Sequence, residues 1–487
     1  MMPDDQKNGQ ANFSDVEGMT RQNRNQAMGA ISVSVAMAIL DTAIVNTALP
    51  SIAKDLGVGH SDSVWIITAY QMSMVAAMLP FAAYGDLKGH RKVFLTGLGV
   101  FILASLACGI SPSFLGLVAA RFVQGIGAAA IMSANTALVR QIYPARILGR
   151  GLGLNALVMA FSFAAGPPMA SIILSFTSWH WLFLINVPIC ILAFFLSWQK
   201  LPKEDKGKSQ KFDVVPAVIC ASLFALWVHG LGQLAHGSMT SLPIIEEAVA
   251  LILGIFLVRW QSSHERPLLA VDLFRISFFS LSAITAFLAF IVQGMIFVAM
   301  PFLLQGKLGF DVIMTGFLIA PWPLMGAFLA PIAGRLSDRY PAGILGGIGL
   351  AILGLGIGVI SVLPPHTKPI IAVIMMALCG GGFGFFLSPN QRALMSSAPT
   401  TRSGAASGVL GISRILGQTT GATLVAFCLY LSSDHGAEIA LRIGIFIAFA
   451  GLYGQFVAFA EKADFKKKPL LVRLYSRIKN VPSYLIF

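Results

Sequence analysis

Charged residues are scarce in this chain, and their scarcity excludes most classes of soluble protein. Asp, Glu, Lys and Arg make up 11% of the 487 residues, hydrophobic residues make up 56%, and the mean hydropathy is +0.77. A soluble domain carries about 25% charged residues. Apolar stretches of about 20 residues recur along the sequence, and this length spans a bilayer as an α-helix. The chain is therefore predicted to be an all-α integral membrane protein.

Paired cysteines and catalytic motifs are also missing. The sequence has no CxxC, no GxxxxGK[ST] phosphate loop, no HExxH and no GxSxG. We therefore expect no enzymatic activity, no ATP drive, no metal site and no cofactor. The five cysteines stand singly in apolar segments and are predicted to pack as small hydrophobic side chains; they are Cys108, Cys190, Cys220, Cys379 and Cys428.

The formal net charge of +13 is better explained by the topology of a membrane protein than by a nucleic-acid binding site. If both termini are cytoplasmic, 28 of the 34 Lys and Arg fall in tails, cytoplasmic loops or the cytoplasmic ends of spans, four fall in outer loops or at an outer span end, and two lie well inside spans. This asymmetry is the positive-inside rule. We expect two cytoplasmic termini, a bilayer as the main partner, and no nucleic acid.

Fourteen spans are predicted, and two are inserted between repeated halves. The spans are 28–50, 64–84, 92–110, 114–139, 150–173, 179–199, 213–234, 243–260, 278–304, 312–332, 342–363, 369–388, 404–431 and 441–460. They divide the chain into a cytoplasmic tail at 1–27, a six-helix half at 28–199, a linker with two inserted helices at 200–277, a second six-helix half at 278–460, and a cytoplasmic tail at 461–487.

The two halves repeat a series of residues in the same order. Pro50 is echoed by Pro301, Asp86 by Asp338, and Ser133-x-Asn135 by Ser388-x-Asn390, at offsets of 251, 252 and 255. One match could arise by chance among apolar helices, but an ordered series with so small a drift could not. Parallel repeats of six helices are typical of membrane transporters.

A carboxylate lies in the first apolar stretch. Asp41 is the only charged residue between Met28 and Pro50. A charge at the centre of the bilayer costs on the order of 2.5–3.5 kcal/mol on insertion scales, and chains that keep one usually use it in a polar cavity or an ion path. Asp41 is therefore predicted to carry a proton or to face a cationic substrate. The alternative is a helix-packing carboxylate bonded to Thr42 or another hydroxyl.

A buried arginine in the fourth span is the second candidate for proton coupling. Arg121 keeps its proton and needs an acceptor. At 1.5 Å per residue, Asp41 lies about 20 Å from the cytoplasmic end of its span and Arg121 about 10 Å from the outer end of its own. In a core about 30 Å thick these depths agree, but depth does not tell whether the two side chains face each other. A purely structural arginine bonded to carbonyls remains the alternative.

The segments around Asp41 and Arg121 resemble motifs of the major facilitator superfamily, and within it the branch of fourteen-helix drug:proton antiporters. Leu40-Asp41-x-x-Ile-Val-Asn46-x-Ala-Leu-Pro50 is similar to the first-helix signature of that branch, and Arg121-Phe-Val-Gln124-Gly-Ile-Gly-Ala-Ala129 to the fourth-helix motif of the superfamily. A third segment, with Gly153, Gly166 and Pro167, resembles the antiporter motif, although Ser or Ala replaces three of its five glycines.

The resemblance extends to two cytoplasmic loops and to the thirteenth span. Gly85–Lys92 and Gly334–Arg339 resemble gating loops, in which Asp86, Arg91, Asp338 and Arg339 would form reversible charge pairs. Exposed pairs of this kind are worth about 0–1 kcal/mol each. Arg414-Ile-Leu-Gly-Gln418 resembles a further signature of the branch, and either a cavity-lining or a structural role is open to it. The other cavity candidates are Asn46, Gln71, Gln124, Asn155, Gln293 and Trp322.

The resemblance implies a monomeric antiporter of the cytoplasmic membrane that exports amphipathic, cationic drugs in exchange for protons by alternating access. Asp41 would bind the proton and Arg121 would help to release it. We see no second acid in the other spans apart from residues near their ends, which favours one proton per cycle. The alternatives are an exporter of one metabolite, siderophore or fatty acid with the same fold, and an uncoupled facilitator or sensor.

Overall fold

The computed structural model describes residues 19–144, 147–202, 214–235, 241–261, 271–337, 339–365, 367–399 and 403–467. Every regular element within these ranges is a helix. The N-terminal half contains α1 (Arg21–Leu56), α2 (His60–Ser63), α3 (Trp65–Lys88), α4 (His90–Gly109), α5 (Phe114–Ile142), α6 (Leu148–Phe176), α7 (Trp181–Leu184) and α8 (Asn186–Lys200). The inserted pair is α9 (Val214–Ala235) and α10 (Ser241–Gln261), and the short η2 (Val271–Arg275) follows it.

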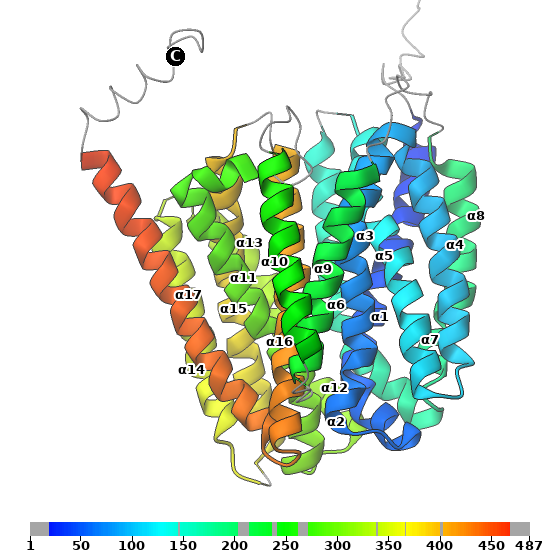
Figure 1. Cartoon of the computed structure of the whole chain (residues 1–487), viewed down its shortest axis with the longest axis vertical. Coiled ribbons are helices and arrows are strands. Elements are labelled where there is room, and N and C mark those ends of the chain that lie inside the picture. The colour runs from blue at the N-terminus through cyan, green and yellow to red at the C-terminus, as the bar shows by residue number, and fades with distance from the viewer. Residues whose placement is uncertain are drawn as a thin grey trace, which may run out of the picture.

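The C-terminal half has a similar series of helices. It contains α11 (Ser277–Phe302), the π-helical turn η3 (Leu303–Lys307), α12 (Val312–Ile319), α13 (Pro321–Leu336), α14 (Ala342–Ser361), α15 (Pro369–Ser397), α16 (Ser403–Leu431) and α17 (Gly436–Lys467). Figure 1 shows the two halves side by side, with the start of α1 and the end of α17 on the same side of the bundle.

Thirteen helices in the described ranges are long and apolar enough to cross a membrane. The predicted span at 213–234 forms α9, whose apolar stretch Val218–Gln233 is shorter than the others. Each of the other predicted spans also coincides with helical structure. The all-helical fold with two halves and an inserted pair is therefore confirmed.

Several helices begin or end at other residues than the predicted spans, for local reasons. Residues 21–27, assigned to the tail, belong to α1, because Thr20 caps that helix by accepting a hydrogen bond from Asn23 N. The span predicted at 312–332 coincides with one candidate span, Val312–Leu336, in which α12 and α13 meet at Ala320, directly before the proline at the start of α13. A proline lacks the amide hydrogen that would continue the helix. The last span begins earlier than predicted, at Gly436, and continues beyond the expected boundary to Lys467.

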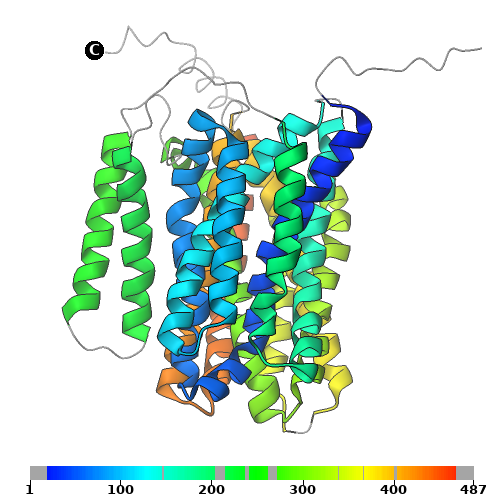
Figure 2. The same ribbon diagram turned by 90° about the vertical axis from the view of Figure 1, so that its right-hand side faces the viewer.

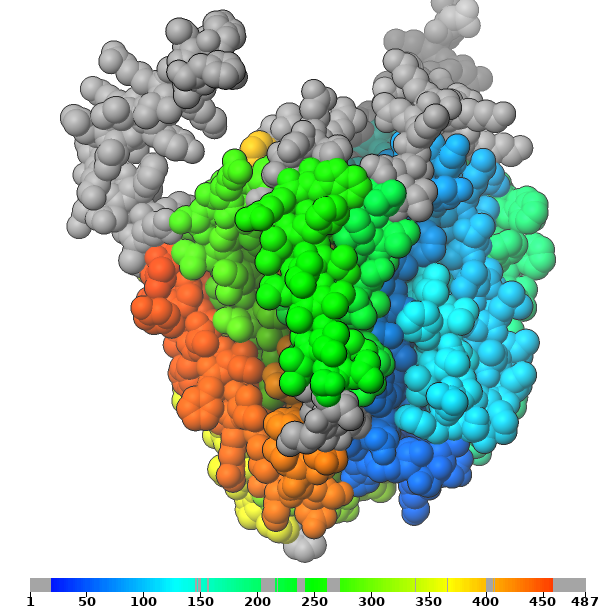
Figure 3. Space-filling view, in the orientation of Figure 1, coloured from blue at the N-terminus to red at the C-terminus, as the bar shows by residue number. Residues whose placement is uncertain are grey.

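The inserted pair lies against the seam between the two halves. α9 packs on α3 of the first half and on α16 of the second, and α10 packs on α9. Figure 2 shows the pair as a hairpin at the edge of the bundle, and Figure 3 shows it covering the boundary between the N-terminal and C-terminal helices. The halves also contact each other directly, through α1 with α11 and α6 with α12. Since α1 carries Asp41, the polar residues around that acid lie in the first half, close to this boundary.

Candidate functional site

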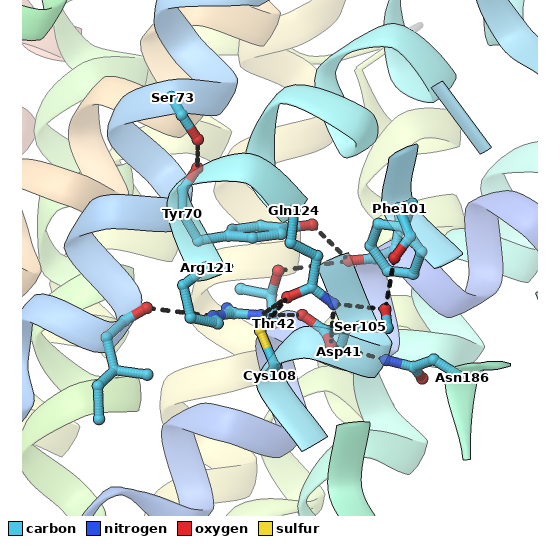
Figure 4. Close-up of polar contacts among 12 residues, drawn as sticks. Asp41, Thr42, Tyr70, Ser73, Phe101, Ser105, Cys108, Arg121, Gln124 and Asn186 are labelled. Carbon is cyan, nitrogen blue, oxygen red and sulfur yellow. Dashed lines mark hydrogen bonds and ion pairs between the residues drawn. The ribbon is translucent and has the colours of Figure 1, made fainter. Parts of the chain in front are cut away.

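Asp41 is surrounded by hydrogen-bond donors from two neighbouring helices. Its Oδ2 forms an ion pair with Arg121 Nη1 of α5. Its Oδ1 accepts a hydrogen bond from Asn186 Nδ2 of α8 at 2.8 Å and another from Gln124 Nε2 of α5 at 3.0 Å. Figure 4 shows these side chains converging on the carboxyl group. All three of these contacts bring a donor to the carboxyl, an arrangement that suits its ionised form.

Arg121 is held from several sides, so its charge has a fixed position. Its Nε donates to the carbonyl of Ile66 at 3.2 Å, and its Nη1 also donates to Gln124 Oε1 at 2.6 Å. The guanidinium carbon lies 4.2 Å from the centre of the Tyr70 ring, which is a cation–π contact. Arginine is the residue best suited to such paired, stacked sites, because its planar group donates in fixed directions.

The network is closed to solvent. Asp41, Arg121, Gln124 and Asn186 are each 0% exposed. Gln124 completes the arrangement by donating to Ser105 Oγ at 2.8 Å, and Ser105 donates in turn to the carbonyl of Phe101 at 2.7 Å. Breaking a buried ion pair by removing one partner costs about 3–5 kcal/mol, because the other charge is left without compensation. Because these side chains are buried, Asp41 has no direct route in this conformation for exchanging a proton with solvent.

The glycines that follow Arg121 explain how α5 can approach α3 and α4 so closely. A Cβ at Gly127 would lie 2.7 Å from Phe101 N, and a Cβ at Gly125 would lie 3.0 Å from the carbonyl carbon of Tyr70. Both distances are too short for a side chain, so α5 packs with its backbone directly against α4 and α3. Glycine permits this close approach. The segment from Arg121 to Gly127 thus serves two purposes: Arg121 and Gln124 bind Asp41, and the glycines let the helices pack closely around it.

A small pocket lies beside the network, on the boundary between the halves. Four predicted cavity residues line it, Asn46, Gln71, Gln293 and Gln418, together with Thr42, Phe163, Gly294, Phe297 and Val298. Gln418 Nε2 donates to Gln293 Oε1 at 3.0 Å. The cavity volume of this pocket is about 10 Å³, room for roughly one water molecule, whereas a typical site for a drug-sized ligand measures roughly 300–1,000 Å³. A larger ligand therefore requires the halves to separate further.

Other predicted cavity residues lie elsewhere. Trp322 is buried in the core of the second half, with its ring 5.9 Å from those of Phe297 and Phe383. Asn155 Nδ2 lies 3.7 Å from Met159 Sδ on its own helix, outside the lining of the pocket. Arg414 lies one helical turn before Gln418 on α16.

The predicted gating residues make local contacts in this conformation. Asp86 Oδ1 lies 3.0 Å from His90 Nε2, one turn along the chain, and the Asp86 side chain is 75% exposed. Arg91 Nη2 donates to the carbonyl of Trp198 in α8 at 2.6 Å. Asp338 lies outside the described residues, whereas Arg339 lies in the turn after α13. These contacts of Asp86 and Arg91 lie within the first half, and the gating role of both residues stays a prediction.

The segment that resembles the antiporter motif brings α6 against two helices. A Cβ at Gly166 would overlap the side chain of Ala43 on α1, two residues from Asp41. Ser171 Oγ donates to the carbonyl of Val312 in the second half at 2.7 Å. At Gly153, in contrast, an added Cβ would meet no atom within 4 Å. Of these two predicted glycines, Gly166 is thus the one whose small size the packing requires.

The sequence did not identify two polar partners and one further cluster. Neither Asn186 nor Ser105 was among the predicted site residues, because an isolated amide or hydroxyl in an apolar helix resembles packing. Within the inserted pair, His229 Nδ1 lies 2.9 Å from Glu246 Oε2. The hydroxyl of Thr42, offered as a partner for Asp41, donates to the carbonyl of Ala38 instead.

The comparisons with known proteins agree with this architecture. A sequence profile of the Major Facilitator Superfamily matches residues 31–422. The uncharacterised transporter YebQ of Escherichia coli is 44% identical over 433 residues, which cover 89% of this chain and 95% of that protein. The multidrug resistance protein Stp of Mycobacterium tuberculosis is 28% identical over 404 residues, covering 82% of this chain and 75% of Stp.

A solved structure shares the fold. A bacterial homologue of the human lysosomal transporter Spinster, crystallised in an inward-facing and unoccupied conformation, superposes with a TM-score of 0.62 at 15% identity. The match covers 91% of this chain and 96% of that protein.

Proposed function

Because the chain belongs to the major facilitator superfamily and is a multi-pass membrane transporter rather than an enzyme, we propose that it is a proton-coupled antiporter that exports amphipathic organic compounds. The observation that carries this proposal is the buried Asp41–Arg121 pair beside an amide-lined pocket at the boundary of the halves. The name of Stp supports a role in drug export.

Asp41 is the proton carrier of the proposed cycle. Taking up a proton removes its negative charge and weakens its hold on Arg121 and on the two amides that donate to it. Asp41 and Asn46 lie on the same helix, and Asn46 lines the pocket. A movement of α1 that opens the closed network to solvent therefore also changes the pocket.

Alternating access couples that proton to the cargo. In the outward-open state Asp41 is protonated from outside and the compound leaves. In the inward-open state Arg121 favours loss of the proton, and a new compound enters from the cytoplasm. The pocket suits amphipathic cargo, because amides of Asn46, Gln71 and Gln293 lie beside the rings of Phe163 and Phe297. The protein is proposed to work as a monomer in the cytoplasmic membrane, with both termini inside.

The test is efflux of two fluorescent dyes from energised cells that contain the full chain. The dyes are rhodamine B, which has a free carboxylate, and its ethyl ester, a cation. Export of at least one dye should stop with a protonophore and should be lost in Asp41→Asn. The matched control is Asp434→Asn, which changes an acid in the turn before α17.

Two results would oppose the proposal. Efflux that persists in Asp41→Asn and still stops with the protonophore would show that coupling does not pass through this acid, whereas efflux that the protonophore does not affect would indicate an uncoupled facilitator. No efflux of either dye, from cells in which the chain is present in the membrane, would favour an exporter of one metabolite.

A further inference from the structure

Arg414 is a second arginine inside the membrane domain, and its surroundings differ from those of Arg121. It lies near the middle of α16, 11 residues after the first residue of that helix. Its side chain is part-exposed, and among the described residues it has neither a hydrogen-bond acceptor nor an ion-pair partner. A cation without a partner is costly in a membrane, so chains usually place one where it meets an opposite charge.

The face of α16 that carries Arg414 points toward the boundary between the halves. One turn earlier, Gly411 lies against α3, since its Cβ would be 3.3 Å from Met78 Cε. One turn later, Gln418 contacts Gln293 and lines the pocket. Residues three or four positions apart lie on the same side of a helix. Arg414 is therefore placed between α3 and the pocket, on the side of the pocket nearer the start of α1 and the end of α17.

The residues described around the pocket offer Arg414 no counter-charge. The lining of the pocket consists of amides, a hydroxyl and apolar groups. The carboxylate of Asp41 is 0% exposed, and both of its oxygens are bound within the closed network. The sequence-based expectation of a cationic substrate fits this arrangement poorly, because the accessible charge near the pocket is positive.

We propose that Arg414 binds a carboxylate of the transported compound, so that the substrates are amphipathic acids or zwitterions. This inference rests on the proposed export function and specifies the substrate. A guanidinium donates two parallel hydrogen bonds to a carboxylate, which gives strength and direction. The amides of Gln418 and Gln293 bind further polar groups of the compound, and Phe163 and Phe297 contact its apolar body.

The experiment measures binding of the two rhodamine dyes to the purified full chain by fluorescence anisotropy. The dyes share one ring system and differ at the carboxyl group. We expect the free acid to bind at least about tenfold more tightly than the ester, the size of one charge-assisted pair. Arg414→Gln should abolish this difference while leaving ester binding within about twofold, and Arg414→Lys should keep part of it. Arg140→Gln, at the exposed end of α5, is the matched control.

The outcomes separate this inference from the proposed function. A free acid that binds no better than the ester, or not at all, contradicts the role of Arg414, as does an Arg414→Gln variant that weakens both dyes equally. Binding is measured without a proton gradient. Arg414-dependent binding without proton-coupled efflux would therefore retain this inference and reject the antiporter. Proton-coupled efflux, combined with a preference between the dyes that Arg414→Gln leaves unchanged, would retain the antiporter and reject the role of Arg414.

Discussion

The two arginines within the membrane domain occupy opposite environments. Arg121 is fully buried, paired with Asp41 and bonded to Gln124 and to the carbonyl of Ile66. Arg414 is part-exposed and has no partner among the described residues. A buried pair fixes a geometry that is costly to break, whereas an unpaired group remains available. The first half therefore holds a closed ion pair, and the second half presents a charge near the cavity.

The largest effect is expected from removing the charge of Asp41. Asp41→Asn leaves Arg121 buried without its counter-ion and should lower the free energy of unfolding by about 3–5 kcal/mol. Proton-coupled efflux should be lost at the same time. Denaturant unfolding in detergent measures the first effect and vesicle transport the second. The double variant Asp41→Asn/Arg121→Gln should regain much of the stability but no transport. A double variant as unstable as the single one would show that charge pairing is not the cause.

A smaller effect is expected from the amides, and it should differ between the regions. Gln124→Ala removes a donor to Asp41 and an acceptor for Arg121, which should cost about 1.5–3 kcal/mol, the value for hydrogen bonds to charged groups. Gln418→Ala removes one amide–amide hydrogen bond at the pocket and should cost about 0.5–1.5 kcal/mol. Denaturant unfolding in detergent measures the loss of stability in both variants. Equal losses of stability would mean that the hydrogen bonds of Gln124 to the ion pair are no stronger than the amide–amide bond of Gln418.

The glycines of α6 provide a steric test of the closed region. Gly166→Ala forces a methyl group into Ala43 on α1 and should cost about 1–3 kcal/mol through overpacking. It should also reduce transport, because Ala43 is two residues from Asp41. Gly153→Ala is the control, since no atom lies within 4 Å of the added carbon, and should leave stability and transport nearly unchanged. Thermal melting and dye efflux of both variants measure the difference, and a tolerated Gly166→Ala would argue against close packing here.

The smallest effect on stability is expected at Arg414. Arg414→Gln removes a charge that has no partner among the described residues, so stability should change by less than about 0.5 kcal/mol or should increase. This is the opposite of the loss expected when the partner of Arg121 is removed. Unfolding of Arg414→Gln beside Arg140→Gln gives the comparison. A loss above about 2 kcal/mol would mean that Arg414 has a structural role.

The sequence predicted more of the fold than of the site. The positions of the helices, the repeat of Pro50 by Pro301, and the presence of Asp41 and Arg121 inside apolar segments were all readable from the chain. Equal depth correctly suggested that Asp41 and Arg121 could meet. Trp322 was expected at the cavity but packs against Phe297 and Phe383, because an aromatic residue in an apolar helix gives no sign of the direction in which it points.

The sequence by itself determined that this protein is a bundle of membrane helices, because a long apolar segment satisfies its own backbone hydrogen bonds only as a helix. It also determined which charges lie inside long apolar segments. The tertiary structure alone decided which partners those charges have. It turned Asn186 and Gln124 toward Asp41, placed Gln418 at the pocket and left Arg414 without a partner among the described residues. The rotation of each helix depends on contacts with its neighbours, such as Gly166 against Ala43, and these contacts join residues far apart in the chain.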